Sequence, residues 1–207
     1  MANPYQSVRD FEATVSKWAG AKYGVAVESC CAAIFLSLKW LQPGYAEIPK
    51  FTYPGVAMAI KNCRVELRFR NENWKGIYNI RMFRDSIIDS ALRFRKGMYI
   101  KNTLYCLSFH YKKHLPIGRG GMILTDDKKA VEWLKMARFD GRKEMPLYKD
   151  NATICGWNMY LTPEQASRGL VLFDTIKDKN LPDLKVKNQR YPDLTKWECF
   201  KESKNGR

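Results

Sequence analysis

The sequence has few of the features that mark membrane-spanning, metal-binding or exported proteins. Its longest apolar stretch, Cys30–Leu38, is far shorter than the ~20 residues that a membrane-spanning helix needs. The first residues, MANPYQSVRDFEA, carry charge where a signal peptide has an apolar segment. None of the six cysteines forms a C-x-x-C pair and there are only two histidines, so we expect free thiols and no metal site. A soluble, cytoplasmic protein without membrane contact is therefore expected.

Positive charge is abundant, but no single basic run contains it. The chain of 207 residues has 36 Lys and Arg against 21 Asp and Glu, a formal net charge of +15. Such a charge attracts polyanions, among them nucleic acid, nucleotides and phosphorylated ligands. Because the basic residues are spread along the chain, a solvated basic surface explains the charge equally well. Charge alone therefore identifies no partner.

The order of expected elements predicts the fold class. Length and a hydrophobic content of 45% suit one globular domain. Short apolar runs alternate with segments of helical spacing, which is typical of an α/β domain with a parallel sheet. We expect a three-layer α/β/α fold with a mostly parallel mixed sheet over residues 1–179, with one antiparallel strand near Met122–Thr125. Residues 70–84 are expected to be an irregular connection, and residues 180–207 a basic tail or remnant.

Three polar residues stand where expected strands end. Ser29 follows the apolar run 23–27, Asp89 ends a run that begins at Ser86, and Ser108 ends another. Ligands of such sheets gather at the carboxyl ends of the strands. The small-residue turn after Ser29 leads into a helix, as in many phosphate-binding units. The sequence therefore predicts a site at this edge.

The segment SFHYKKHLPIGRGGM, Ser108–Met122, has the most informative local pattern. A lysine in a strand-to-loop setting before a Gly-rich turn is what a Schiff-base site needs. Its amine must lie near a carbonyl cofactor and be partly desolvated, so that its pKa falls and it acts as nucleophile and base. Lysines in surface loops are common, so spacing alone leaves an ordinary surface lysine as the alternative.

Five motifs, in the correct order, resemble those of the DegT-type sugar aminotransferases, which are fold-type I pyridoxal-phosphate enzymes. The motifs are Ser29-Cys-Cys-Ala-Ala33, Pro49-Lys-Phe-Thr-Tyr53, Ile87-Ile-Asp-Ser-Ala91, Ser108 to Gly121, and Gly156-Trp-Asn-Met-Tyr160 followed by Gln165-Ala-Ser167. The resemblance covers roughly residues 7–179. It implies the large domain of a fold-type I aminotransferase, pyridoxal phosphate as cofactor, and amino transfer as the activity.

The resemblance also implies a role for each matched residue. Lys113 would form the Schiff base and move the proton, whereas Lys112 is expected to be solvated. Asp89 would pair with the pyridine nitrogen and keep it protonated, and Tyr53 would stack on the ring. The residues implied for the cofactor phosphate are Ser29, Cys30 and Cys31 at a helix N-terminus, Ser108 with its hydroxyl, and Asn158 from the neighbouring subunit.

The partners follow from the same resemblance. It implies a homodimer with a shared active site, a small-molecule amino donor, and a nucleotide-linked keto sugar as acceptor. The chain departs from the family pattern by being much shorter, with a compressed region between Phe69 and Ser86 and no small domain after Lys179. Single-residue departures are Cys30-Cys31 for Gly-Thr, Leu92 for Gln or His, Arg119 for Glu and Tyr160 for Arg.

Two hypotheses of different classes remain at this point. One is a working transaminase with an altered substrate. The other is a catalytically inactive or nucleic-acid-associated descendant, motivated by the net charge of +15, by Arg119 and by the cluster Arg93-Phe-Arg-Lys96. Lys113 and Asp89 at matched spacing favour the enzyme, because a chain drifting from pyridoxal chemistry has no evident reason to keep both.

Overall fold

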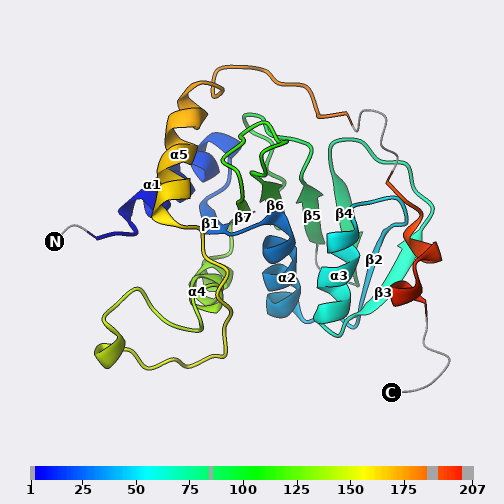
Figure 1. The fold of residues 1–207 in the computed structure, drawn as a ribbon, viewed down its shortest axis with the longest axis horizontal. Helices are drawn as coiled ribbons and strands as arrows, with labels where there is room; N and C mark the ends of the chain where they lie inside the picture. The colour runs from blue at the N-terminus through cyan, green and yellow to red at the C-terminus, as the bar shows by residue number, and fades with distance from the viewer. Residues whose placement is uncertain (1–2, 84–85, 186–190, 202–207) are drawn as a thin grey trace.

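A seven-stranded mixed sheet forms the centre of the protein, in the order β1-β7-β6-β5-β4-β2-β3 (Figure 1). The structure is a computed structural model, which describes residues 3–83, 86–185 and 191–201. Strands β4 and β7 run opposite to the other five, so the expected mostly parallel mixed sheet is confirmed. The strands are β1 (Tyr23–Val27), β2 (Tyr45–Pro49), β3 (Glu66–Arg70), β4 (Tyr78–Arg81), β5 (Ser86–Ser90), β6 (Leu104–Ser108) and β7 (Gly121–Thr125).

Helices cover both faces of the sheet and complete the expected three layers. One hydrophobic core joins α2, α3 and α4 to the sheet, and a second joins α1 and α5 to its other face. No helix in the described ranges is long and apolar enough to cross a membrane. The α-helices are α1 (Gln6–Ala19), α2 (Cys30–Leu41), α3 (Pro54–Asn62), α4 (Lys128–Ala137) and α5 (Pro163–Asp174). Short 3₁₀ helices are η1 (Leu147–Lys149), η2 (Leu194–Lys196) and η3 (Glu198–Phe200).

The expectation of an irregular connection at residues 70–84 is wrong, because this stretch contains β4. Tyr78 and Ile80 are buried, while Asn79 and Arg81 are exposed. This alternation is only four residues long, too short to stand out in the sequence. Pairing with β5 on one side and with β2 on the other makes it a strand.

The start of β7 brings the end of β6 against the start of α2. Ser108 is the register partner of Gly121 in the β6–β7 ladder. A Cβ atom on Gly121 would lie 2.4 Å from the carbonyl carbon of Ser29, so only glycine lets the two backbones approach this closely. The polar ends of β1 and β6 therefore meet at one edge of the sheet.

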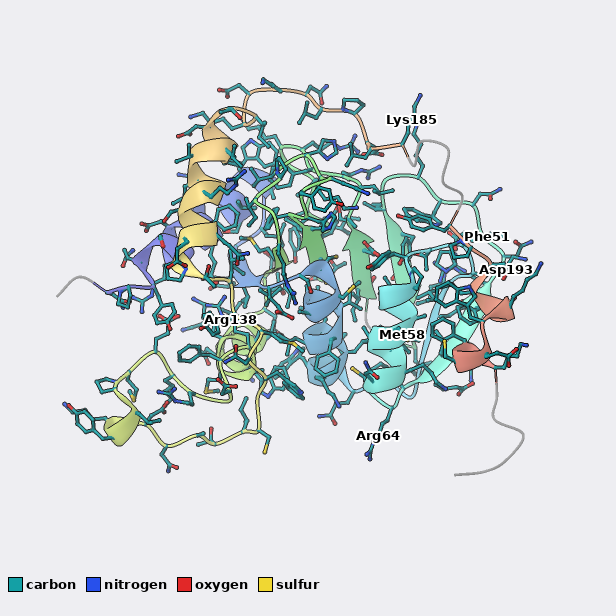
Figure 2. The ribbon with its side chains drawn as sticks, viewed as in Figure 1. Phe51, Met58, Arg64, Arg138, Lys185 and Asp193 are labelled. Carbon is teal, nitrogen blue, oxygen red and sulfur yellow. The ribbon has the colours of Figure 1, made fainter. Side chains whose placement is uncertain are left out.

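The segment after α5 runs along this same edge and then packs beside β2 and β3 (Figure 1). Leu194 is fully buried, and its backbone N–H donates to the Lys50 carbonyl at 3.0 Å. Asp193 and Phe51 form an isolated antiparallel bridge and lie side by side in Figure 2. Residues 191–201 thus contribute to the packed structure.

Candidate active site

The loop after β6 carries the predicted lysine. Backbone hydrogen bonds hold this loop: Lys113 N–H donates to the His110 carbonyl at 2.8 Å, and Tyr111 N–H to that of Gly118 at 3.0 Å. Lys113 is half-buried, whereas Lys112 is exposed, with its amine 5.4 Å from the centre of the Tyr111 ring. Of the two adjacent lysines, the loop turns Lys113 inward.

The environment of Lys113 favours its neutral amine. Burial lowers the pKa of Lys113 below its usual value of 10.5, while Cys30, Asp89 and Cys31 act in the opposite direction. A lowered pKa leaves a larger neutral fraction at neutral pH, and the neutral amine is the nucleophile. The lysine is therefore adapted to attack a carbonyl carbon.

Asp89 lies at the end of β5 as a buried carboxylate, with 5% of its surface exposed. It accepts hydrogen bonds from the Tyr78 hydroxyl at 2.8 Å and from the Ala91 backbone N–H at 2.9 Å. The Thr52 hydroxyl in turn donates to Tyr78 at 2.8 Å. Burial raises the pKa of Asp89, and the hydrogen bonds from Ala91 and Tyr78, together with the charge of Lys113, oppose this. Two hydrogen bonds thus orient a carboxylate that water hardly reaches.

Lys113 and Asp89 lie near each other without forming an ion pair. Each group shifts the pKa of the other, yet within the described ranges no ion pair of 4.0 Å or less joins them. The amine and the carboxylate are thus two neighbouring but separate charged groups of the site.

The N-terminus of α2 forms another wall of the site. The Ser29 hydroxyl caps the helix by accepting from the Ala32 N–H at 3.1 Å. In the part of the chain that the structure describes, the N–H groups of Cys30 and Cys31 have no acceptor. Two free N–H groups at the positive end of a helix dipole are a common anion site.

The two cysteines that replace glycine and threonine are packed within the fold and lie close enough to Lys113 and Asp89 to interact with both. Cys30 is buried in the core between α2 and the sheet. The Cys31 sulfur lies against α3, where a Cβ on Gly55 would approach it to 2.6 Å. Burial raises the pKa of both thiols, that of Cys31 to about 11, so both are protonated at neutral pH. The side chains that the substitution adds are accommodated by helix packing.

Other residues predicted for the site are placed less directly. Tyr53 immediately precedes α3 and is 57% exposed. Ser108 is half-buried at the end of β6, and no side-chain hydrogen bond engages it in the described structure. Asn158 donates to Asp140 at 3.0 Å, and no hydrogen bond within the described residues joins it to Lys113 or Asp89. Asn158 is thus not assembled with the lysine and the carboxylate in this chain.

Two of the departures have structural compensation. Arg119 forms an ion pair with Glu28 at 2.7 Å, immediately before Ser29. Tyr160 packs edge-on against the rings of Tyr5 and Phe139. Both changed side chains thus form contacts with neighbouring residues of the fold.

Sequence reasoning missed two tyrosines of the site. Tyr78 binds Asp89 from β4, a strand that was not expected. Tyr191 lies in the segment after α5; burial raises its pKa to about 12, and Asp89, Tyr53 and Cys30 add to the shift. The alternation around Tyr78 is a weak local signal, whereas nothing local indicates Tyr191.

Solved structures share this architecture, and several of them are aminotransferases. 3-Amino-5-hydroxybenzoic acid synthase aligns with a TM-score of 0.69 at 18% identity, covering 82% of this chain and 56% of that one. Helicobacter pylori PseC, an aminotransferase of pseudoaminic acid biosynthesis, gives 0.67 at 16% identity, with 82% and 58% covered. Spr1654 of Streptococcus pneumoniae, assigned as a sugar aminotransferase and solved in its PLP form, gives 0.67 at 15% identity, with 81% and 59% covered. The fold is therefore that of the fold-type I aminotransferases, and the chain spans little more than half the length of these proteins.

Sequence similarity gives the family. The family model of the DegT/DnrJ/EryC1/StrS aminotransferases matches residues 1–71 and 99–187. The chain belongs to this aminotransferase family. A search of curated proteins gives no match. The unmatched residues 72–98 include β4, β5 and Asp89. The assignment of Asp89 to the site therefore rests on its position in the structure and on the motif Ile87–Ala91, and not on the family model.

Proposed function

We propose that the chain binds pyridoxal phosphate through Lys113 and transfers an amino group. The observation that carries the proposal is the placement of three groups at one sheet edge. These are the half-buried amine of Lys113, the buried carboxylate of Asp89 and the free N–H groups at the start of α2. Membership of an aminotransferase family supports the same activity.

The residues present fit this cofactor on the chemistry of their side chains. An aldehyde needs a neutral amine, a protonated pyridine nitrogen needs a carboxylate, and a phosphate needs N–H donors. Lys113, Asp89 and the N-terminus of α2 supply these three, with Ser29 and Ser108 beside the phosphate donors and Tyr53 open to stack on the ring. When bound, pyridoxal phosphate would supply an aldehyde carbon for the amino group and a ring that accepts electrons.

Lys113 performs the proton transfer in this proposal. With the cofactor bound, the amine of Lys113 would hold the aldehyde end, and Nζ would accept and return the α-proton of the amino donor. Proton transfer by a positioned group contributes about 10²–10⁴-fold. The lowered pKa of Lys113 supports this role, since the amine must be neutral to accept the proton.

Asp89 and its neighbours would serve the other end of the cofactor. The carboxylate would hold a proton on the ring nitrogen, and Tyr78 fixes the orientation of the carboxylate through the 2.8 Å hydrogen bond. Its 5% exposure keeps water from competing for that proton. Arranged donors and acceptors of this kind act more strongly in a buried site than in water.

The acceptor proposed is a nucleotide-linked keto sugar, and the assembly proposed is a homodimer. Asn158 would then reach the cofactor phosphate of the neighbouring subunit. Its present hydrogen bond to Asp140 involves one N–H of the side-chain amide, so its carbonyl and second N–H stay available. The family and the aminotransferase neighbours support a sugar acceptor in general.

The test is the visible absorption spectrum with added pyridoxal phosphate. We expect an absorption band that borohydride removes while fixing the cofactor covalently on Lys113. Lys113→Ala should lack the band, and Lys112→Ala, in the exposed neighbour, should retain it. A wild-type protein without the band, or a Lys113→Ala variant with the same band and the same attachment, contradicts the proposal.

The nucleic-acid alternative stays a prediction with less support than the net charge suggests. Arg119 pairs with Glu28, and Arg93 pairs with Asp183 at 2.7 Å. Two of the arginines that motivated this alternative are therefore already engaged by carboxylates.

A further inference from the structure

The direction of β4 places a phenol beside the buried carboxylate of the site. Strand β4 is antiparallel to β5, and its first residue, Tyr78, is the register partner of Asp89 near the end of β5. Residues that face each other across antiparallel strands have their side chains on the same side of the sheet. The Tyr78 hydroxyl accordingly donates to Asp89 Oδ2 at 2.8 Å. The start of one strand thus joins a site whose other members lie at the ends of strands.

A second hydroxyl fixes the direction of this hydrogen bond. Thr52, between β2 and α3, donates to the Tyr78 hydroxyl oxygen at 2.8 Å. An ionised carboxylate only accepts hydrogen bonds, so Tyr78 must donate its single proton to Asp89, and Thr52 must then donate to Tyr78. Thr52 is 1% exposed and Tyr78 is 4% exposed, so water does not replace either donor. The three side chains therefore form a hydrogen-bond chain with one direction, from Thr52 through Tyr78 to Asp89.

The two oxygens of Asp89 each receive one donor. Oδ2 accepts from Tyr78, and Oδ1 accepts from the Ala91 backbone N–H at 2.9 Å. No other hydrogen bond reaches either oxygen within the part of the chain that the structure describes. Since a carboxylate has about four lone-pair sites, Asp89 keeps the capacity to accept a further N–H. Donors on both oxygens favour its charged form.

The groups that face Asp89 give the hydrogen bonds particular importance. Burial raises the pKa of Asp89, whereas Ala91, Tyr78 and the charge of Lys113 lower it. Lys113 must be neutral to act as a nucleophile, so its charge does not then assist Asp89. Burial also raises the pKa of the neighbouring thiols and phenols, which are neutral at neutral pH: Cys30 and Cys31 on α2, Cys106 on β6, Tyr78 on β4 and Tyr191 after α5.

We propose that Thr52 and Tyr78 are positioning residues that keep Asp89 ionised, so that a proton shared with a bound pyridine ring stays on the ring nitrogen. The use of the ring rests on the proposed function, whereas the ionisation of Asp89 is a property of the chain alone. Each hydroxyl keeps its own proton, and no proton moves along the chain. Tyr78 acts through Asp89, and Thr52 acts through Tyr78.

The first test measures the pKa of Asp89 in the protein without cofactor, by NMR of carboxyl-labelled aspartate, with Asp89→Asn to assign the signal. Tyr78→Phe should raise this pKa by about one to two units, because the charged form loses one hydrogen bond. Thr52→Val should raise it by less, and Thr52→Ser, which keeps the hydroxyl, should restore the wild-type value. The matched control is Tyr105→Phe, which removes a buried phenol oxygen that contacts Ser90 at 3.1 Å. It should leave the pKa of Asp89 within about 0.3 units of the wild-type value.

The second test compares binding of pyridoxal phosphate with that of its deaza analogue, whose ring has no nitrogen. Tyr78→Phe should weaken pyridoxal phosphate by about tenfold more than the analogue, since only the former shares a proton with Asp89. An unchanged Asp89 pKa in both Tyr78→Phe and Thr52→Val, an equal change in Tyr105→Phe, or equal weakening of the two ligands overturns the inference.

The cofactor band on Lys113 separates this inference from the proposed function. A normal band in the wild type with an Asp89 pKa that does not respond to Tyr78→Phe rejects the role of the hydrogen-bond chain alone. A raised Asp89 pKa in Tyr78→Phe, in a protein whose wild type gives no band, supports control of Asp89 by the chain and rejects the proposed function alone.

Discussion

Two neighbouring spaces at one edge of the sheet are built in different ways. The inner space, between Lys113, Asp89 and the start of α2, uses strand ends and a helix N-terminus that the sheet itself fixes. The outer cavity uses the loop between β3 and β4 together with the segment after α5. The inner space therefore depends on the sheet and α2, whereas the outer one depends on contacts between segments that are distant in sequence.

The largest effect is expected at Asp89, in the inner space. Asp89→Asn should lower amino transfer by about two to four orders of magnitude, because the ring nitrogen loses the carboxylate that keeps it protonated. The melting temperature without cofactor should change little, since removal of a buried charge offsets the loss of one of the two hydrogen bonds, from Tyr78 or from Ala91. Kinetics and thermal unfolding of the same variant measure both. An unchanged rate would exclude Asp89 from the chemistry.

Truncation of Leu194 should disturb the outer cavity. Leu194→Ala removes a fully buried side chain and is expected to cost about 2–5 kcal/mol of unfolding free energy. Urea denaturation measures the change. Lys196→Ala, at an exposed position of the same 3₁₀ helix, is the control, and an equal loss in both variants would contradict the anchoring role of Leu194.

A pair of glycine variants sharpens the comparison. Gly121→Ala pushes a Cβ to 2.4 Å from the backbone of Ser29, and Gly76→Ala pushes one to 2.1 Å from an Asp183 oxygen at φ +72°. Each should cost about 1–3 kcal/mol. Gly121→Ala should weaken cofactor binding, and Gly76→Ala should leave the cofactor band preserved. Titration of both variants with the cofactor decides, and the reverse pattern would refute the division.

Much of the inner space could be predicted from the sequence. Ser29, Asp89 and Ser108 follow apolar runs that are strands by composition, so their meeting at one edge follows from strand direction alone. Lys113 was distinguished from Lys112 by its motif, and the structure turns Lys113 inward. The local pattern carries this information because each residue is placed by the strand immediately before it.

The outer cavity could not be predicted, because no local pattern determines it. Tyr191 reaches Trp74 and the site only through the packing of Leu194 and the pairing of Asp193 with Lys50, all distant in sequence. The sequence did not predict Tyr78 as a site residue, because β4 is recognisable as a strand only from its pairing with β5. Contacts between distant segments have no periodicity that a single sequence reveals.

The smallest expected effect is the pH dependence from Lys113. Its folded pKa is below the usual 10.5, so between the lowered value and 10.5 the unfolded chain binds more protons. The free energy of unfolding should therefore gain a contribution that rises with pH through this window. Urea denaturation without cofactor, wild type against Lys113→Met, isolates it. Lys112→Met should show the wild-type slope, and an identical slope in Lys113→Met would mean that the lysine is not desolvated.

The position of the segment after α5 has a consequence for the order of assembly. The strands and helices that form the inner space are complete once α5 has been synthesised, but the bonds from Leu184 to Leu92 and from Leu194 to Lys50 join late residues to early ones. Closing such long loops is slow, and chains fold from the N-terminus during synthesis. A nascent chain would thus bring Lys113, Asp89 and the start of α2 together at one sheet edge before the segment that carries Tyr191 packs beside them, so translation itself would separate the two events in time.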